Sequence, residues 1–413
     1  MSWLDDKAHE GLALIREVKK LDLYPHFRAF ESGGLHTTID GKGIVNFSSN
    51  DYLGLSTHPE VKRAAAAAVE RFAVGLSSSR VQATTTAHIE LEERLAKWFG
   101  FESCLLFTTG YQAMVGTLQA LSDRQTTLVL DNLSHACILD GTFLAAGVPA
   151  QSPEVRYFNH NSVRSLERCL KTREREHAIV LMEGIYSLDG DRAPLSDFVE
   201  VCEKYDAVLL CDDAHGTGTL GRRGTGLAEE TGMEGRVPLV ISTFSKTFGG
   251  IGGILLGASD VVDFVKHNAR SFLFSATLPV PVLAAASTIL DMLEREGPAL
   301  VQELHEKAAY MRKSLIELGF DLGKSDTHIM PVMCRDLRKA LFMHTALLEK
   351  GVMMVPITYP GVKFGEERLR LNVTRGHSRE DMDLALELLD RYGRAFGVQS
   401  GEELGPLEGL FAP

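Results

Sequence analysis

The chain has 413 residues, of which 45% are hydrophobic and 24% are charged, and these fractions are those of an ordinary globular protein. This length allows two domains, or one large α/β domain with an appendage. The formal net charge of −12 argues against non-specific binding to nucleic acids and to an anionic membrane surface, so we predict neither partner.

The six cysteines are scattered and form neither a CxxC pair nor the Cys/His spacing of zinc ligands. This pattern favours free thiols in a reducing compartment and predicts no metal site. Residues 1–20 are charged and amphipathic and lack the apolar core of a signal peptide. Residues 273–290 are the most apolar window, but Pro279 and Pro281 favour a turn and a buried helix over a membrane span. We therefore predict a cytoplasmic protein without a transmembrane segment.

The first elements expected along the chain are helical and hairpin-like. An amphipathic helix is predicted over residues 5–20, and an extended stretch with a hairpin around residues 40–43 follows it. A second helix is predicted over residues 57–72. Thr57 can cap this helix, Pro59 suits its first turn, and its body is rich in alanine.

Between about residues 100 and 260, short apolar runs alternate with segments of helical periodicity. The apolar runs occupy residues 104–107, 127–130, 178–182, 208–211, 239–241 and 253–256. Runs that are apolar on both faces and separated by helices predict a mainly parallel sheet that is covered on both sides. Ligands of such sheets bind outside the carboxyl ends of the strands, so the polar residues that follow these runs are expected to line one crevice.

After a long helical pattern over residues 297–318, three apolar runs alternate with two helical segments, which predicts a smaller α+β domain. The last fifteen or so residues are rich in Gly, Glu and Pro and are expected to be loose. The predicted organisation is an amino-terminal helix and hairpin segment (1–55), a large domain (56–290), a small carboxyl-terminal domain (291–398) and a tail (399–413).

Lys246 is the most informative residue, because it follows the apolar run that ends at Ile241 and precedes two glycines. Asp212 and His215 follow another apolar run in the same way. A lysine near an Asp and a His at the carboxyl ends of strands suits pyridoxal phosphate (PLP) chemistry. The lysine forms a Schiff base, and the carboxylate keeps the pyridine nitrogen protonated, so that the ring withdraws electrons. The alternative is a surface lysine beside an unrelated turn.

Other residues after the apolar runs fit the same cofactor. Thr109 and Gly110 join a strand to a predicted helix, whose free N–H groups can cradle a phosphate, and Thr243 can add a hydroxyl. His215 could reach the phenolic oxygen of the cofactor, and His135 could stack on its ring and shuttle protons. The alternatives are a simple connection for the turn and structural roles for both histidines.

Arg370 lies inside an otherwise apolar strand and needs an anionic partner there. A substrate carboxylate would bind it bidentately, whereas the alternative is a structural salt bridge. Arg368 and Arg375 compete for the same role.

Other nucleotide and hydrolase motifs have little support. Residues 216–221 match GxGxxG, but Arg222 and Arg223 follow and do not easily open the helix that a dinucleotide site requires, so we interpret the glycines as a sharp loop beside the active site. No glycine precedes Lys246 at P-loop spacing, and the sequence contains no HExxH or GxSxG pattern.

Seven motifs occur together in one order. They are FSSNDYLGLSTHP (47–59), TTGYQA (108–113), DNLSHACILDG (131–141), EGIYSLDGD (183–191), CDDAHGTGTLG (211–221), STFSKTFGG (242–250) and ERLRLNVTRGHS (367–378). The chain resembles, from about residue 20 to residue 395, the α-oxoamine synthase family of PLP-dependent enzymes. This resemblance implies a type I aminotransferase-like fold and a homodimer with active sites at the subunit interface.

The resemblance also implies roles for individual residues. The cofactor contacts that it implies are Lys246, His135, Ser187, Asp212, His215, Thr109, Gly110, Tyr111 and Thr243, with Ser275 or Thr277 from the partner subunit. Lys246 would also act as the acid and base at the substrate α-carbon. Arg370 and Asn50 would contact the amino-acid substrate.

The implied reaction is the decarboxylative condensation of serine, glycine or alanine with an acyl thioester, carried by coenzyme A or an acyl carrier protein, to give an α-amino ketone. Two alternatives stay open at this point: an aminotransferase or lyase on the same fold, and a non-catalytic PLP-fold partner subunit. The intact set of Lys246, Asp212 and His135 argues against the second. One departure is the Ala-Thr-Thr-Thr run at residues 83–86, where many relatives have a glycine-containing turn near the acyl-donor site.

Overall fold

A computed structural model describes residues 2–147, 152–402 and 404. The chain forms two compact units, one within residues 50–306 and the other within residues 1–49 and 307–413. The sequence analysis divided the chain into four segments, and this division into domains remains a prediction. The compact units end at other residues because a strand near residue 45 pairs with one near residue 352, which joins the two ends of the chain in one unit.

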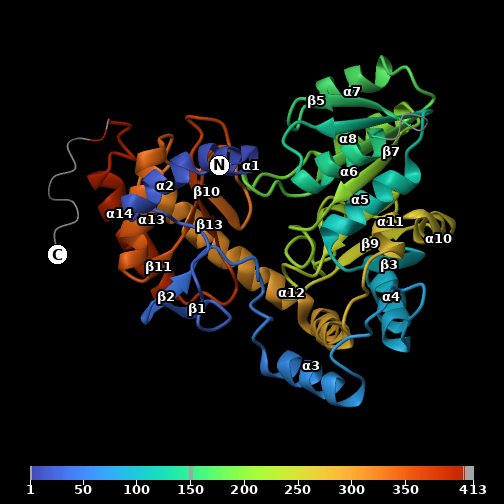
Figure 1. Ribbon diagram of the computed structural model, residues 1–413, viewed down its shortest axis with the longest axis horizontal. Helices are drawn as coiled ribbons and strands as arrows, with labels where there is room; N and C mark the ends of the chain where they lie inside the picture. The colour runs from blue at the N-terminus through green and yellow to red at the C-terminus, as the bar shows by residue number, and fades with distance from the viewer. Residues whose placement is uncertain (1, 148–151, 403, 405–413) are drawn as a thin grey trace. The chain divides into compact units, whose positions relative to one another are not determined.

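The unit of residues 50–306 is built on a seven-stranded sheet with the order β3-β9-β8-β7-β6-β4-β5 (Figure 1). The strands are β3 (Ser103–Phe107), β4 (Thr126–Asp131), β5 (Glu154–Phe158), β6 (His177–Glu183), β7 (Val208–Asp212), β8 (Leu239–Thr243) and β9 (Gly253–Gly257). The pairs from β5 through β8 are parallel, and β9 runs antiparallel to both of its neighbours. The prediction of a mainly parallel sheet is confirmed.

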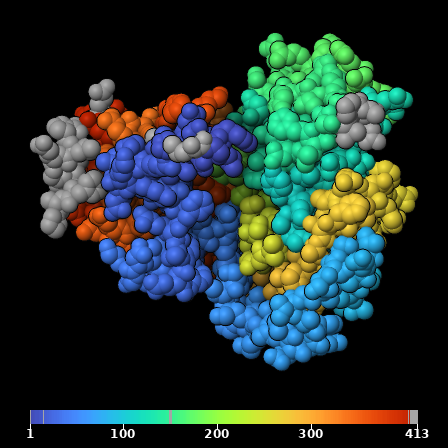
Figure 2. Space-filling model, in the orientation of Figure 1, coloured from blue at the N-terminus to red at the C-terminus, as the bar shows by residue number. Residues whose placement is uncertain are grey.

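Helices flank this sheet because its strands are apolar on both faces. Every residue of β4, β8 and β9 is buried. The helices of this part of the chain are α3 (Pro59–Arg71), α4 (Thr86–Phe99), α5 (Gly110–Leu121), α6 (Ala136–Ala146), α7 (Val163–Lys171), α8 (Leu195–Lys204), α9 (Leu227–Glu230), α10 (Ser259–Asn268), α11 (Arg270–Leu273) and α12 (Val280–Glu317). One apolar core gathers side chains of the sheet with those of α5, α6, α10 and α11. Figure 2 shows α10 at the surface of this unit, where the Phe264 side chain is exposed.

Two details of the sequence prediction change. The helix expected over residues 5–20 is two helices, α1 (Trp3–Gly11) and α2 (Ala13–Lys20), separated at Leu12. The cap of α3 is the His58 side chain, which accepts a hydrogen bond from the N–H of Glu60, rather than that of Thr57. Among the helices in the described part of the chain, none combines the length and apolar character that crossing a membrane requires.

The second unit is an α+β arrangement of two small sheets and helices, as predicted. Its elements, besides α1 and α2, are β1 (His36–Ile39), β2 (Lys42–Asn46), β10 (Ile329–Met333), α13 (Leu337–Glu349), β11 (Val352–Met353), β12 (Val355–Ile357), β13 (Arg368–Asn372) and α14 (Arg379–Ala395). Strands β1 and β2 form the expected antiparallel hairpin, with positive φ at Asp40 and Gly41 in its turn. The sheets have the orders β1-β2-β11 and β10-β13-β12.

His377 connects the two ends of the chain within this unit. Its ring stacks on Phe47 with the centroids 4.0 Å apart. Its Nδ1 accepts a hydrogen bond of 3.0 Å from the N–H of Thr374, so its Nε2 carries the proton and donates to the carbonyl oxygen of Asn46 at 3.3 Å. Burial lowers the pKa of His377 from 6.5 to about 4, because removal from water disfavours the charged ring.

This depressed pKa makes stability depend on pH. The unfolded chain protonates His377 near pH 6.5, whereas the folded chain keeps it neutral down to about pH 4. The free energy of unfolding should therefore fall as the pH decreases from 6.5 to 4, by up to about 1.4 kcal/mol per pH unit for this group. Urea unfolding followed by circular dichroism should give a shallower decline for His377→Gln than for the exposed control His267→Gln. Equal declines in the two variants would contradict this assignment.

Candidate active site

A cavity of about 360 Å³ opens at the carboxyl ends of the central strands. Strands β6, β7 and β8 end here with Glu183, Asp212 and Thr243, and the register places Glu183 opposite Asp212. Neighbouring parallel strands finish at the same edge, so their last side chains and the loops after them meet. The predicted residues that line the cavity are Thr109, Gly110, Tyr111, His135, Asp212, His215, Thr243 and Lys246.

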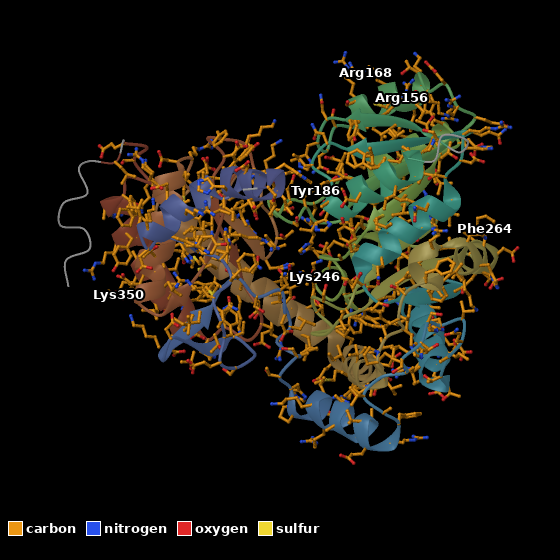
Figure 3. The ribbon with its side chains drawn as sticks, in the orientation of Figure 1. Arg156, Arg168, Tyr186, Lys246, Phe264 and Lys350 are labelled. Atoms are coloured by element: carbon orange, nitrogen blue, oxygen red, sulfur yellow. The ribbon has the colours of Figure 1, made fainter. Side chains whose placement is uncertain are left out.

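Lys246 lies in the tight loop after β8 and is half-buried (Figure 3). The loop closes through a hydrogen bond of 2.8 Å from the N–H of Gly249 to the carbonyl oxygen of Lys246. Gly249 has a φ of +57°, and a Cβ there would lie 2.6 Å from Cβ of Ser56. The glycine after the lysine is thus required by backbone conformation and by close packing.

Asp212 and Asp213 are adjacent in the sequence, but their carboxylates lie in different surroundings. The Asp212 carboxylate lines the cavity, and its Oδ1 accepts a hydrogen bond of 3.2 Å from the N–H of Ala214. The Asp213 carboxylate instead accepts from the N–H of Leu227 at 2.7 Å, and burial raises its pKa to about 7.

Three glycines make room for Asp213. A Cβ on Gly184, Gly216 or Gly226 would approach a carboxylate oxygen of Asp213 to 2.2, 2.0 and 1.8 Å, respectively. Gly216 begins the GxGxxG match, and the residues after it form turns rather than a helix. The interpretation of these glycines as a sharp loop beside the site, not a dinucleotide fingerprint, is confirmed.

The turn before α5 is shaped to receive an anion. Thr109 caps the helix, and its Oγ1 accepts a hydrogen bond of 3.0 Å from the N–H of Gln112. The N–H groups of Gly110 and Tyr111, which precede Gln112 in the first helical turn, have no acceptor within the helix and can bind a phosphate. A Cβ on Gly110 would lie 3.0 Å from Cβ of Thr243, and one on Gly253 would lie 2.2 Å from the carbonyl oxygen of Thr109. Both glycines therefore keep this cradle open.

His135 lies at the mouth of the cavity, where it caps α6. Its Nδ1 accepts a hydrogen bond of 3.2 Å from the N–H of Cys137, which leaves the proton of the neutral ring on Nε2. Its own backbone N–H donates to Oε1 of Glu183 at 2.7 Å. His135 is thus held through its backbone and Nδ1, and the residue is exposed.

His215 belongs to a buried chain of hydrogen bonds. The hydroxyl of Tyr52, which is fully buried, contacts Nδ1 of His215 at 2.6 Å and Oδ1 of Asn50 at 3.1 Å. Asn50 therefore lies near His215, although it does not line the cavity. Tyr52 was not predicted as a site residue. The sequence feature that could have identified it is its position in the motif at residues 47–59.

Comparison with known proteins gives the family. Residues 42–389 match the family Aminotransferase class I and II. The chain is 37% identical over 388 residues to an 8-amino-7-oxononanoate synthase of Thermoanaerobacter pseudethanolicus, covering 93% of this chain and 96% of the relative. It is 33% identical over 390 residues to a serine palmitoyltransferase of Sphingobacterium spiritivorum, covering 94% and 96%.

Solved structures agree with this assignment. A serine palmitoyltransferase of Sphingomonas wittichii matches 96% of this chain and 100% of its own, with a TM-score of 0.89 and 30% identity. A structure of SPT with PLP matches the same shares with a TM-score of 0.88 and 31% identity. The chain belongs to the α-oxoamine synthases. It has the type I aminotransferase-like fold, its cofactor is PLP, and it is a PLP-dependent acyltransferase.

The residues of this α-oxoamine synthase fit the cofactor that the family uses. The glycine-lined turn before α5 matches a phosphate, and the Asp212 carboxylate lies in the same cavity as Lys246. A carboxylate at one end and a cradle of N–H groups at the other correspond to the cationic and anionic ends of PLP.

Five predicted residues lie outside the lining of the cavity. Besides Asn50, they are Ser187, Ser275, Thr277 and Arg370. Ser275 accepts a hydrogen bond of 2.8 Å from Nε2 of Gln112, and Thr277 contacts Nε2 of His88 at 2.8 Å. Ser187 follows β6 and is half-buried.

Glu183 is a lining residue of this synthase that was not singled out from the sequence. It is buried, and its carboxylate accepts the backbone N–H groups of His135 and Ser187. Burial, with a smaller contribution from Asp212, raises the pKa of Glu183 well above its usual value, while the positive charge of Lys246 opposes this rise. Its signal is the first position of the motif at residues 183–191.

The close approach at Gly253 predicts a loss of cofactor affinity in Gly253→Ala. Because the new Cβ meets a backbone atom, the Thr109 turn must shift. The dissociation constant for PLP, measured by titrating the apoprotein and following visible absorbance, should rise at least about tenfold, or roughly 1.4 kcal/mol. Gly75→Ala is the matched control, because a Cβ there meets nothing within 4 Å. Unchanged affinity in Gly253→Ala would refute the role of this cradle.

Proposed function

We propose that this enzyme condenses a small amino acid with an acyl thioester, releases CO₂ and the free thiol, and forms an α-amino ketone. The observation that carries the proposal is the cavity that holds Lys246 and Asp212 at the ends of adjacent parallel strands. Relatives named 8-amino-7-oxononanoate synthase and serine palmitoyltransferase support it at 37% and 33% identity. Their names point to different products, so the amino acid and the acyl chain are the variables to test.

Lys246 has two tasks in this proposal: it holds the cofactor covalently, and it then moves the proton at the substrate α-carbon. PLP, when bound, supplies an electron sink for that carbon. The Asp212 carboxylate accepts the N–H of the pyridine ring and favours its protonated form. His135 covers the ring, and His215 and Ser187 bind its phenolic oxygen. His215 is oriented for this task by the buried hydroxyl of Tyr52.

The phosphate group is assigned to the turn before α5. Thr109, Gly110 and Tyr111 supply N–H groups, and Thr243 supplies a hydroxyl. The Tyr111 side chain is engaged elsewhere: its hydroxyl donates to the Asp140 carboxylate, and this hydrogen bond raises the pKa of Tyr111 to about 12. Tyr111 therefore contributes through its backbone. We further propose a homodimer in which Ser275 or Thr277 reaches the phosphate of the partner's site.

Arg370 is proposed to bind the carboxylate of the amino acid, together with Asn50. The Nε and Nη2 atoms of Arg370 are buried and have no hydrogen-bond partner among the residues that the structure describes. A guanidinium remains charged at any ordinary pH, so these donors need an anionic acceptor. Arg368 competes less well, because its Nε donates to the carbonyl oxygen of Glu366 at 2.9 Å.

The direct test measures both products of the condensation. The PLP-loaded protein is incubated with glycine, alanine or serine and with acyl-CoA or acyl carrier protein thioesters of increasing chain length. Free thiol and CO₂ should appear in a one-to-one ratio with one amino acid. A keto acid formed without any thioester would identify an aminotransferase instead. PLP binding with no turnover of any pair would favour a non-catalytic subunit.

Lys246→Ala should retain the fold but lose turnover. Because proton transfer by a positioned side chain contributes on the order of 10²–10⁴-fold, kcat for thiol release should fall by at least that factor. Lys266→Ala, on the surface of α10, is the matched control and should keep the wild-type rate. A Lys246→Ala rate within twofold of the wild type would exclude this lysine from the chemistry.

Arg370→Lys should mainly weaken substrate binding. The ammonium group cannot offer the two parallel N–H bonds of a guanidinium, so KM for the amino acid should rise at least about tenfold while kcat changes less. Steady-state kinetics with Arg394→Lys, an exposed arginine, provide the comparison. A KM equal to that of the control would show that another residue binds the substrate carboxylate.

A further inference from the structure

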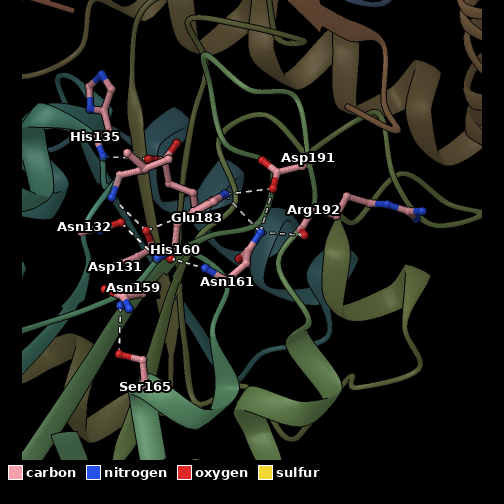
Figure 4. Close-up of polar contacts among 11 residues, drawn as sticks. Asp131, Asn132, His135, Asn159, His160, Asn161, Ser165, Glu183, Asp191 and Arg192 are labelled. Atoms are coloured by element: carbon pink, nitrogen blue, oxygen red, sulfur yellow. Dashed lines mark hydrogen bonds and ion pairs between the residues drawn. The ribbon is translucent and has the colours of Figure 1, made fainter. Parts of the chain in front are cut away.

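His160 lies just beyond β5, beside the active site but not among the residues that line it. Its two ring nitrogens contact two different carboxylates. Nδ1 is 3.1 Å from Oδ1 of Asp131, and Nε2 is 2.9 Å from Oδ2 of Asp191 (Figure 4). The imidazole therefore joins two segments that are 60 residues apart in the sequence and that both lead into the site.

The first segment runs from Asp131 to His135. The Asp131 side chain is fully buried at the end of β4, and its Oδ1 also accepts a hydrogen bond of 2.8 Å from the N–H of Leu133. The backbone N–H of His160 donates to Oδ1 of Asn132 at 3.0 Å. His160 thus holds this segment through both its side chain and its backbone, four and three residues before His135.

The second segment is the loop of residues 184–192, which carries Ser187. Tyr186 donates its N–H to the carbonyl oxygen of Asp191 at 3.0 Å, so the loop closes on itself. The Tyr186 ring packs edge to face against the His160 ring, with the centroids 4.4 Å apart. Asn161 adds hydrogen bonds to Oδ2 of Asp191 at 2.9 Å and to the carbonyl oxygen of Arg192 at 3.1 Å.

The geometry requires a doubly protonated ring, because each nitrogen must donate to a carboxylate. Burial lowers the pKa of His160, but the hydrogen bonds that its ring donates to Asp131 and Asp191 outweigh burial and raise the pKa to about 10. The ionisable side chains of Asp131, Asp191 and Tyr186 contact the ring. The nearby Arg192 side chain is instead paired with Glu230 at 3.1 Å. The imidazolium is therefore an interior cation between two carboxylates.

We propose that His160 is a positioning residue that fixes His135 and Ser187 relative to one another across the mouth of the cavity. The Glu183 carboxylate accepts the backbone N–H groups of both residues, and His160 joins their two segments. Two independent links make the spacing of the ring-covering histidine and the serine rigid. This inference rests on the proposed function for the roles of His135 and Ser187. The contacts of His160 do not depend on that function.

Two conservative substitutions each keep one of the two side-chain contacts of His160 and remove the other. His160→Asn keeps a donor near the position of Nδ1, toward Asp131, and His160→Gln keeps one near Nε2, toward Asp191. Asp191→Asn removes one carboxylate while leaving the histidine in place. The control is His177→Gln, an exposed histidine at the start of β6.

Hydrogen exchange followed by mass spectrometry on the apoprotein is the first measurement. Peptides that cover residues 132–136 and 184–190 should exchange at least tenfold faster in His160→Asn and His160→Gln, and peptides of β10 to β13 should not change. Faster exchange throughout the chain would assign His160 a merely structural role and overturn the proposal.

The second measurement is made on the PLP-loaded protein. The circular dichroism of bound PLP should weaken and kcat should fall at least tenfold in both variants, while KM for the amino acid changes less than threefold. The decrease in Asp191→Asn should not add to that in His160→Asn, because both variants break the contact between residue 160 and residue 191. If the two variants keep the wild-type dichroism and kcat, the proposal is wrong. Should the wild type itself lack condensation activity, the exchange and dichroism results still decide the role of His160.

Discussion

The parallel order of β4, β6, β7 and β8 is the constraint on which the rest of the site depends. It makes four neighbouring strands end at one edge, and three of them end in a carboxylate, at Asp131, Glu183 and Asp212. Concentrating acidic groups in a buried place is costly unless each is compensated. The loops beyond the strands supply that compensation, and the catalytic geometry follows from how they do so.

Each carboxylate is compensated in a different way. Asp131 is paired with the cationic His160, and Glu183 accepts backbone N–H groups and has a raised pKa. Asp213 lies in a nest of glycines and accepts a backbone N–H. Asp212 lines the cavity itself, where a cationic ring nitrogen suits it. Glu183 and Asp212 therefore line the cavity, whereas Asp131 and Asp213 fix the loops around it.

Sequence similarity and site geometry point independently to the same kind of ligand. The similarity to 8-amino-7-oxononanoate synthases and serine palmitoyltransferases extends over more than nine-tenths of the chain. Two features are seen in this chain without any comparison: the Arg370 guanidinium atoms that have no partner among the described residues, and the glycine-lined cradle beside Thr109. Both call for an anion. A substrate with a carboxylate and a cofactor with a phosphate satisfy these two requirements.

The sequence by itself determined the chemistry and the fold class. Lys246, Asp212 and the Thr109 turn could be found because each follows an apolar run, and alternation of such runs with helices dictates a parallel sheet whose strand ends converge. Only the tertiary structure decided that His160 bridges two loops and that Tyr52 orients His215. Those partners are far apart in the chain, and a local pattern records which side chain is polar but not which distant group it meets.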